Sequence, residues 1–251
     1  MTTRQCAGLA QAAGLSRGDV VAFVGAGGKT SAMLALAREL EASGMRVIVT
    51  TTTMVGQTLA SHLPSLTAGA DDARGVARAL DRHRAVLVTG SPDGRGKLRG
   101  LPPEDVERLA RLGDIVLVEA DGARGRSIKA PASHEPVIPG AATVVCPVVG
   151  LDALGRPLAT AAHRPELVAA VAGDAGPVTV GTVTAVLTSE RGALKLVPRE
   201  SAYRPILNKM RGRDEKAREI VEGVFAEDGG RADRIVAGDI AEGRFVVFSR
   251  P

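Results

Sequence analysis

The stretch "VVAFVGAGGKT" (residues 20–30) decides the fold, because it joins an apolar, β-branched run to a helix through a turn of small residues. Residues 29–43 continue it with apolar side chains at helical spacing, and Gly44 follows as a typical C-terminal cap. A strand, a glycine-rich turn and an amphipathic helix in this order are typical of open α/β sheets that bind phosphate at the turn. The stretch therefore predicts both a fold class and the position of a site.

Further strand-like and helical runs alternate along the rest of the chain. Apolar runs lie at 46–53, 85–90, 114–122, 142–150, 204–209 and 233–238, and helical runs at 72–83, 103–112 and 213–224. This alternation predicts a three-layer α/β fold, with a doubly wound, mostly parallel sheet like that of P-loop NTPases. We expect one domain over 1–251, in which 151–200 form a helical insertion that could close over the site as a lid.

Composition narrows the classes of partner. The chain has 251 residues, a net charge of +4 and only 2% aromatic residues, so base-stacking surfaces are scarce and we expect no nucleic acid. Apolar segments are too short to span a membrane. Cys6 and Cys146 match no disulfide framework or metal spacing, which fits a reducing cytoplasm. Cys146, placed at the ligand-side end of its strand, is interpreted as an inert core thiol.

The glycine-rich turn is two residues shorter than the common Walker A loop, and it resembles the compact loop of the Mur ligase family of ATP-dependent ligases. Small residues let backbone N–H groups crowd around an anion, and Lys29 would add a charge to the outer phosphates. The Thr30 hydroxyl is a candidate Mg²⁺ ligand. The predicted nucleotide contacts here are Gly25, Ala26, Gly27, Gly28, Lys29, Thr30 and Ser31.

Two acids end the run at 114–122 in a Walker-B-like arrangement. Glu119 and Asp121 are two apart, so they face the same side of a strand at its carboxyl end. We expect them to complete a metal and water site. Thr52, within four consecutive threonines, is a further candidate Mg²⁺ ligand.

Asn208 and Lys209 follow a predicted strand and resemble the Asn-Lys-x-Asp element by which many GTPases read guanine. Arg211 stands where that element has its acid. We therefore expect these two residues to contact the nucleotide, with the choice between ATP and GTP left open.

Six segments occur in one order and resemble the selenium-dependent molybdenum hydroxylase accessory protein family over roughly 19–210. They are "VGAGGKT" (24–30), "VTTTT" (49–53), "VEADGARGRSIKAPASHEPVIP" (118–139), "VVGLDALGRPL" (148–158), "HRPE" (163–166) and "ILNK" (206–209). The resemblance implies help in maturing molybdenum-cofactor hydroxylases that carry a labile selenium or sulfur ligand, with such an enzyme or its maturation factors as partner. The chain departs from the family pattern at Ile128 and at Met210–Arg211.

Basic residues follow the two acids and predict a place for a second substrate. Arg124, Arg126 and Lys129 would neutralise another anion or charge developing at phosphorus, and Lys129 is a candidate catalytic residue. The stretch His134–Glu135–Pro136 could place a titratable group opposite Lys129, with His134 as the candidate substrate contact. If 151–200 act as a lid, His163 and Arg164 would reach the same place.

The sequence thus favours a Mg²⁺-dependent protein that binds ATP or GTP and works as a slow NTPase or NTP-dependent transferase. Two alternatives remain at this point. One is an ATP-dependent ligase or small-molecule kinase, and the other is a non-catalytic chaperone that nucleotide switches between shapes.

Overall fold

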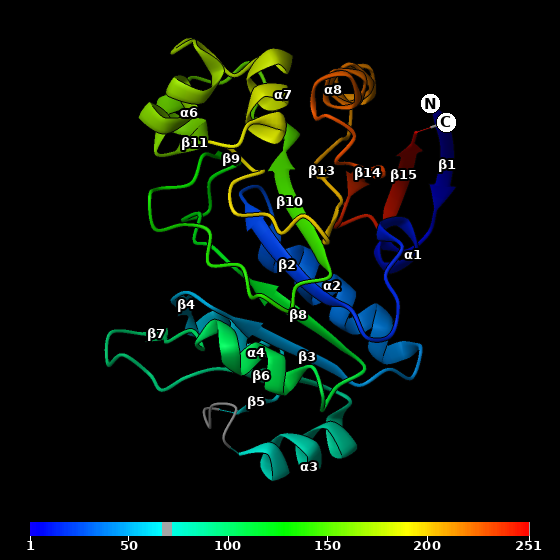
Figure 1. Cartoon of the computed structure of the whole chain (residues 1–251), viewed down its shortest axis with the longest axis vertical. Helices are drawn as coiled ribbons and strands as arrows, with labels where there is room; N and C mark the ends of the chain where they lie inside the picture. Colours follow the sequence, from blue (N-terminus) through cyan, green and yellow to red (C-terminus); the bar gives the residue numbers. More distant parts are fainter. Residues whose placement is uncertain (67–71, 251) are drawn as a thin grey trace.

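The chain is built around one large twisted sheet in a computed structural model that describes residues 1–66 and 72–250 (Figure 1). Within these residues the sheet has 11 strands in the order β1-β15-β14-β13-β10-β2-β8-β3-β6-β5, with β12 beside β10. The strands are β1 (Thr2–Cys6), β2 (Val20–Gly25), β3 (Val47–Thr51), β5 (Ser65–Leu66), β6 (Ala85–Val88), β8 (Ile115–Glu119), β10 (Val144–Gly150), β12 (Ala202–Tyr203), β13 (Ile206–Asn208), β14 (Arg234–Asp239) and β15 (Arg244–Ser249).

Most of this sheet is parallel. β15 pairs antiparallel with β14 and β1, while the other pairings run parallel. Because parallel strands end at one edge, the register brings Gly25 of β2 beside Val148 of β10, and Thr51 of β3 beside Glu119 of β8. The ends of the strands that carry the predicted site therefore meet at one edge of the sheet.

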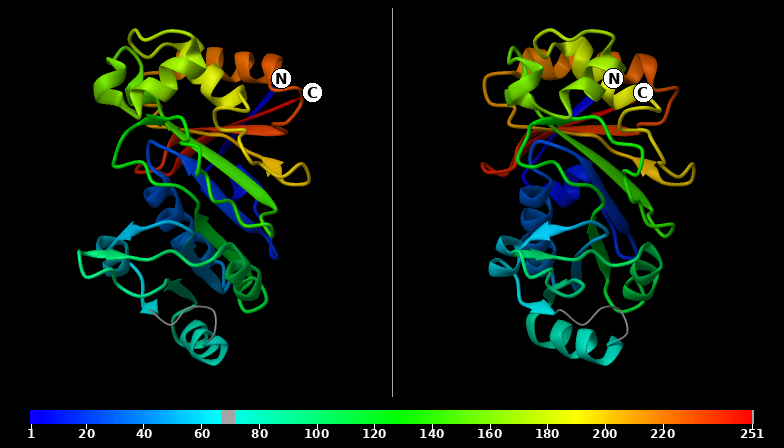
Figure 2. Two further views of the ribbon diagram at one scale, coloured as in Figure 1. Left: turned by 60° about the vertical axis from the view of Figure 1, so that its left-hand side comes forward. Right: turned by 90° about the vertical axis from the view of Figure 1, so that its left-hand side faces the viewer.

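Helices cover both faces of the sheet and make three layers (Figures 1 and 2). One face packs on α1 (Leu9–Ala13) and α2 (Lys29–Ala42). The other face packs on two groups of helices. Successive side chains of a strand point to opposite faces, so alternate residues of the strands enter the cores on the two faces of the sheet. These helices are α3 (Ala73–His83) and α4 (Pro103–Leu109) at one end, with α7 (Val180–Thr188) and α8 (Asp214–Glu227) at the other.

Short elements complete the chain near the carboxyl edge. A two-stranded ribbon joins β4 (Val55–Gly56) to β7 (Lys97–Leu98), and a second pairs β9 (Ile128–Lys129) with β11 (Ala162–His163). The remaining short helices are η1 (Gln57–Ser61), η2 (Leu151–Ala153), α5 (Leu158–Ala161) and α6 (Pro165–Ala172). The β9–β11 pairing ties the helical segment 151–200 to the segment that follows the two acids.

The three-layer, mostly parallel fold predicted from the alternation is confirmed, with some changes of boundary. The helix predicted over 103–112 ends at Leu109. Cys146 does not end its strand, because β10 continues to Gly150. The terminal strands β1 and β15 were missed; β1 is largely exposed and lacks the apolar pattern of a buried parallel strand.

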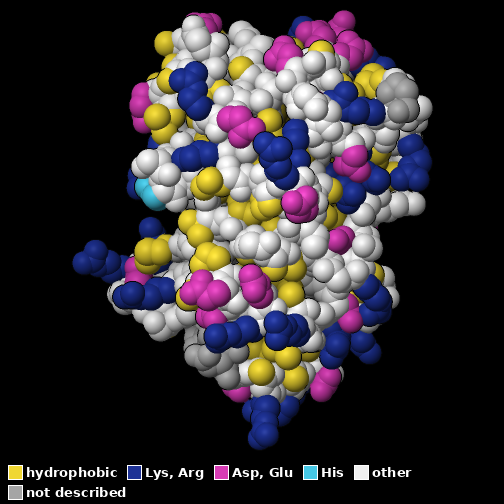
Figure 3. Space-filling view, in the orientation of Figure 1, with side chains coloured by type: hydrophobic (Ala, Val, Ile, Leu, Met, Phe, Trp, Pro, Cys, Tyr) yellow, Lys and Arg dark blue, Asp and Glu magenta, His cyan; other side chains and the backbone are white. Residues whose placement is uncertain are grey.

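The surface agrees with the charge pattern of the sequence. On the face shown in Figure 3, Lys and Arg side chains are interspersed with Asp and Glu, and the basic side chains form no broad stripe there. Among the described residues, the helices are too short or too polar to cross a membrane.

Candidate phosphate site

The turn between β2 and α2 needs glycine for two separate reasons. Gly25, Gly27 and Gly28 have φ values of 85°, 101° and 129°, which side chains disfavour. The turn is also crowded, because a Cβ on Gly27 would lie 2.0 Å from the Gly150 nitrogen and one on Gly28 would lie 2.4 Å from the Asn208 amide nitrogen. The backbone therefore packs closely here, at the positive end of α2.

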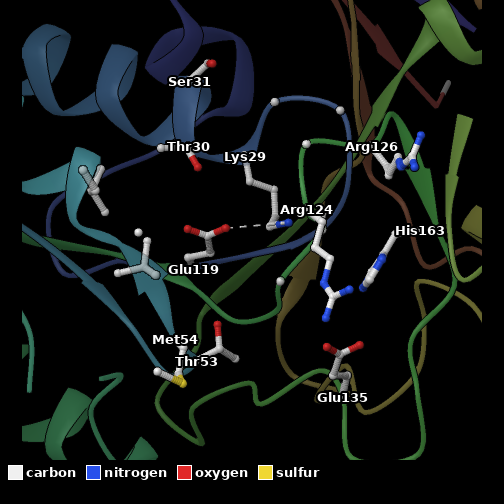
Figure 4. A pocket seen from close by; sticks show the side chains of 18 of the residues that line it. Lys29, Thr30, Ser31, Thr53, Met54, Glu119, Arg124, Arg126, Glu135 and His163 are labelled. Carbon is white, nitrogen blue, oxygen red and sulfur yellow. Dashed lines mark ion pairs between the residues drawn. The ribbon is translucent and has the colours of Figure 1, made fainter. Parts of the chain in front are cut away.

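Lys29 is folded back against the turn and the acids. Its ammonium donates to the Gly25 carbonyl at 2.6 Å and lies 3.0 Å from Asp121 Oδ1 and 3.8 Å from Glu119 Oε1. The residue is only 4% exposed, yet it lines a cavity together with Thr30 and Ser31. Figure 4 shows Lys29 and Glu119 joined across this cavity. The ammonium is thus held beside the turn before any anion arrives.

Asp121 is buried and joins the turn to two lysines. Its Oδ2 accepts from the Gly25 N–H at 2.9 Å and lies 3.0 Å from the Lys129 ammonium, while Oδ1 faces Lys29. The residue is 2% exposed and does not line the cavity. Asp121 therefore holds the loop and the lysines rather than facing a ligand directly.

Of the two predicted acids, Glu119 is the one that lines the cavity. Among the described residues its Oε2 has no hydrogen-bond partner although it is buried. Burial raises the pKa of Glu119, and the carboxylate of Asp121 adds to the rise while Lys29 opposes it. A buried, unsatisfied carboxylate oxygen at the end of a central strand can accept a proton or bind a cation.

Lys129 belongs to a second buried ion cluster and does not line the cavity. Its side chain is fully buried, and its ammonium lies 2.8 Å from Glu135 Oε2 and donates to the Gly122 carbonyl at 2.5 Å. Glu135 also accepts from Arg164 at 2.6 Å. Burial opposes ionisation, but the hydrogen bonds from Lys129 and Arg164 outweigh it and lower the pKa of Glu135 to about 2. Glu135 therefore stays charged into the acidic range.

Glu135 is a cavity residue to which the sequence prediction gave no role apart from its neighbour His134. The prediction placed His134 opposite Lys129, but His134 is exposed and its neighbour Glu135 faces Lys129 instead. The proline-rich turn gave no pattern that tells which of two adjacent side chains points inward. The presence of a buried lysine nearby, which needs an acid, is the signal that would have found Glu135.

The cavity measures about 660 Å³ and carries more positive than negative charge. The predicted residues Arg124, Arg126, His163 and Arg164 all line it, so chain segments far apart in sequence meet there. Figure 4 shows Arg124, Arg126 and His163 to one side of Lys29, and Glu135 beneath them. The charged side chains that line the cavity are Lys29, Lys97, Glu119, Arg124, Arg126, Glu135, Arg164 and Lys209.

Both the nitrogen and the oxygen of the Asn208 side-chain amide form hydrogen bonds within the protein. Its nitrogen donates to the Gly27 carbonyl at 2.8 Å, and its oxygen accepts from the Ile240 N–H at 3.1 Å. Lys209 lines the cavity and pairs with Asp152 at 2.9 Å, whereas Arg211 is exposed and pairs with Glu242. Asn208 therefore fixes the turn, and its predicted contact with a nucleotide would be indirect.

Neighbouring threonines of the run at 50–53 have different roles, because only some of them line the cavity. The Thr52 hydroxyl donates to the Val137 carbonyl at 2.6 Å, and Thr52 does not line the cavity, while Thr53 does. The described residues contain no group of three or more His, Cys, Asp or Glu side chains placed to hold a metal. A cation here would depend on Thr30, Glu119 and oxygens of its own ligand.

Cys146 lies in mid-strand and is fully buried. Burial raises the pKa of its thiol to about 12, from an ordinary 9.0. At pH 8 this lowers the thiolate fraction roughly 1000-fold, and the thiolate is the reactive form. In a Cys6→Ser variant we expect a thiol reagent to modify the folded protein far more slowly than the urea-unfolded protein. Equal rates in the two states would contradict the inert assignment.

Comparisons with known proteins give a family and several distant structures. A sequence model of the YqeC protein family matches residues 21–166. The protein named "Uncharacterized protein YqeC" from Escherichia coli (strain K12) is 36% identical over 187 residues, which cover 72% of each chain.

Among solved structures, chloroplast FtsY from Physcomitrella patens is similar, with a TM-score of 0.45 and 13% identity. That match covers 95% of this chain and 64%, less than two thirds, of the FtsY chain. A chain of the MinC:MinD cell division complex from Aquifex aeolicus is similar with a TM-score of 0.46 and 16% identity, over 87% of this chain and 81% of that one.

Proposed function

We propose that this chain, which belongs to the YqeC protein family, binds a nucleoside triphosphate with its phosphates on the β2–α2 turn. The observation that carries the proposal is the placement of Lys29, buried at the turn yet lining a cavity beside the positive end of α2. Glycine-rich turns that lead into a helix bind phosphate through backbone N–H groups, and a lysine adds charge to the outer phosphates. ATP and GTP both remain candidates.

The donors present fit a Mg²⁺ ion bound together with the phosphates. Glu119 Oε2 is buried without a partner among the described residues, and Thr30 lines the same cavity. Hydroxyl and carboxylate oxygens suit this ion, which keeps most of its remaining positions for water and phosphate. When bound, Mg²⁺ supplies positive charge that stabilises the phosphates as their bonds change. Thr30 and Glu119 would hold it.

Lys29 would have to exchange partners when a triphosphate binds. It now contacts Asp121 and the Gly25 carbonyl, and the phosphates would compete for the same ammonium. Asp121 would keep Lys129 and the Gly25 N–H after the exchange. In this proposal Asp121 and Lys129 are positioning residues, and Glu119 orients or deprotonates the attacking group.

We further propose that nucleotide turnover serves the maturation of molybdenum-cofactor hydroxylases. The support is the resemblance of six ordered segments to the selenium-dependent accessory family, together with the family membership. The partner would be such an enzyme or one of its maturation factors. The segment 151–200 supplies His163 and Arg164 to the cavity, and its role as a lid is part of this proposal.

Calorimetry with ATP, GTP, CTP and their diphosphates, with and without Mg²⁺, tests the proposal. We expect a triphosphate to bind, more tightly with Mg²⁺. Glu119→Gln should still bind the triphosphate, but it should lose turnover and part of the Mg²⁺ enhancement. This variant preserves the shape of the side chain but removes its charge. If none of the nucleotides binds the intact protein, the proposal fails.

The Glu119→Gln variant and an added acceptor separate the alternatives. A non-catalytic, nucleotide-switched chaperone predicts that Glu119→Gln still supports maturation of its partner. A small-molecule kinase or ATP-dependent ligase predicts slow turnover that an acceptor accelerates. The arginines that line the cavity beyond Lys29 favour the second of these alternatives.

A further inference from the structure

One wall of the cavity carries basic side chains that lie away from the phosphate turn. Arg124, Arg126 and His163 face the cavity on the side remote from Thr30 and Ser31 (Figure 4). They come from the loop after β8 and from β11, whereas the turn belongs to β2 and α2. The cavity therefore has two positively charged regions, built from different parts of the chain.

We propose that Arg124, Arg126 and His163 form a subsite for a second substrate, a small molecule with a dianionic head group such as a phosphate monoester or a dicarboxylate. The inference rests on the proposed function, because it places this substrate beside the triphosphate. These three residues together are the arginine wall.

Arg124 supplies the free charge of the arginine wall. Its side chain has no ion-pair or hydrogen-bond partner among the described residues, and its φ of 49° is uncommon for a residue with a side chain. The turn that holds it closes with an Arg126 N–H to Ala123 carbonyl bond of 3.0 Å. The strained backbone of Arg124 is thus fixed by a turn, and it directs an unpaired guanidinium into the cavity.

Neighbouring acids do not neutralise this charge. Glu135 faces the cavity, but it already pairs with Lys129 at 2.8 Å and binds both terminal nitrogens of Arg164, at 2.6 and 3.3 Å. One guanidinium N–H of Arg126 donates a hydrogen bond to the Thr160 carbonyl at 2.5 Å. This bond anchors the side chain and leaves its other N–H groups available. A dianion would therefore meet two guanidiniums with free donors, the arrangement that binds phosphate or carboxylate in pairs of bonds.

His163 lies where a bound dianion would change its pKa and where its charged form would stabilise that dianion. The pairing of β11 with β9 fixes it beside Lys129 in register. Burial lowers the pKa of His163, with Arg164, Lys129 and Arg124 adding to the fall while Glu135 opposes it. A bound dianion would favour the charged imidazolium and raise this pKa. Binding would therefore take up a proton at a pH between the free and the bound pKa of His163, and it would weaken as pH rises through the raised value.

Histidine NMR tests the proposal directly, because the chain has only 4 histidines. The His163 resonance is assigned with His163→Gln and followed against pH, first with Mg²⁺ and a non-hydrolysable triphosphate, then with added probe. The probes are inorganic phosphate, glycerol 3-phosphate and malate. We expect a saturable rise in the pKa of His163 with at least one probe, while His62, His83 and His134 respond less. The probe that binds most tightly identifies the head group.

Matched arginine variants locate the interaction. Arg124→Ala should weaken probe binding roughly tenfold or more, as for loss of a charged hydrogen bond, without changing triphosphate affinity. Arg111→Ala removes an exposed arginine outside the cavity and should leave both affinities unchanged. If triphosphate alone shifts His163 fully and probes add nothing, or if Arg124→Ala weakens the nucleotide equally, the wall belongs to the nucleotide and the proposal is overturned.

The two proposals fail in distinguishable ways. A saturable response of His163 to a probe, in a protein that binds none of the nucleotides, would overturn the proposed function and support the subsite alone. Nucleotide binding without any probe response would do the reverse.

Discussion

Asp121→Ala is expected to lower the free energy of unfolding by about 3–5 kcal/mol, the usual cost of removing one partner from a buried ion pair. Asp121 is 2% exposed and lies 3.0 Å from both the Lys29 and the Lys129 ammonium groups. Its loss leaves two buried ammonium groups with fewer counter-charges and leaves the Gly25 N–H without its acceptor. Urea unfolding in the absence of nucleotide measures the effect.

Two variants show whether charge and burial are the cause. Asp121→Asn keeps an acceptor for the Gly25 N–H but removes the charge, so it should destabilise less than the alanine variant. Asp81→Ala removes an exposed acid on α3 and should stay within about 0.5 kcal/mol of the parent. A loss below about 1 kcal/mol for Asp121→Ala would show that the two lysines do not depend on this carboxylate, contrary to the structure.

The sequence predicted the fold because each element has a strong local pattern. The β2–α2 turn joins a buried strand to an amphipathic helix, and the same alternation recurs through β14. The edge strand β1 was missed because an exposed antiparallel edge lacks that pattern. Local patterns therefore placed the carboxyl edge of the sheet, where the candidate site lies, but not its outer strands.

The direction of individual side chains was harder to predict. Glu119 and Asp121 share a side of the chain by spacing, yet Glu119 lines the cavity and Asp121 does not. Asp121 comes after the last residue of β8, where the two-residue period of a strand no longer applies. The partners of Lys129 and Asn208 come from contacts between distant segments, and one sequence does not encode such contacts as a local signal.

Lys29→Ala is expected to weaken binding of the Mg²⁺-triphosphate roughly 10- to 100-fold, the range for loss of a charged hydrogen bond. The ammonium is already confined to the turn, so little side-chain freedom remains to be lost, but the phosphates must compete with the Gly25 carbonyl and Asp121 for it. Alanine removes the charge without crowding the turn. Calorimetric titration of the variant against the parent measures the difference.

Asp121→Ala should chiefly lower the free energy of unfolding, whereas Lys29→Ala should chiefly lower the affinity for the triphosphate. Lys29→Ala leaves Asp121 paired with Lys129 and the Gly25 N–H, so it should destabilise the protein less than Asp121→Ala does. Lys97→Ala is the matched control, because Lys97 also lines the cavity but is exposed on β7 and remote in sequence from the turn. If Lys97→Ala weakens the triphosphate as much as Lys29→Ala, binding depends on the general charge of the cavity and not on the turn. A selective loss at Lys29 instead ties the phosphates to the glycine-rich turn that follows β2.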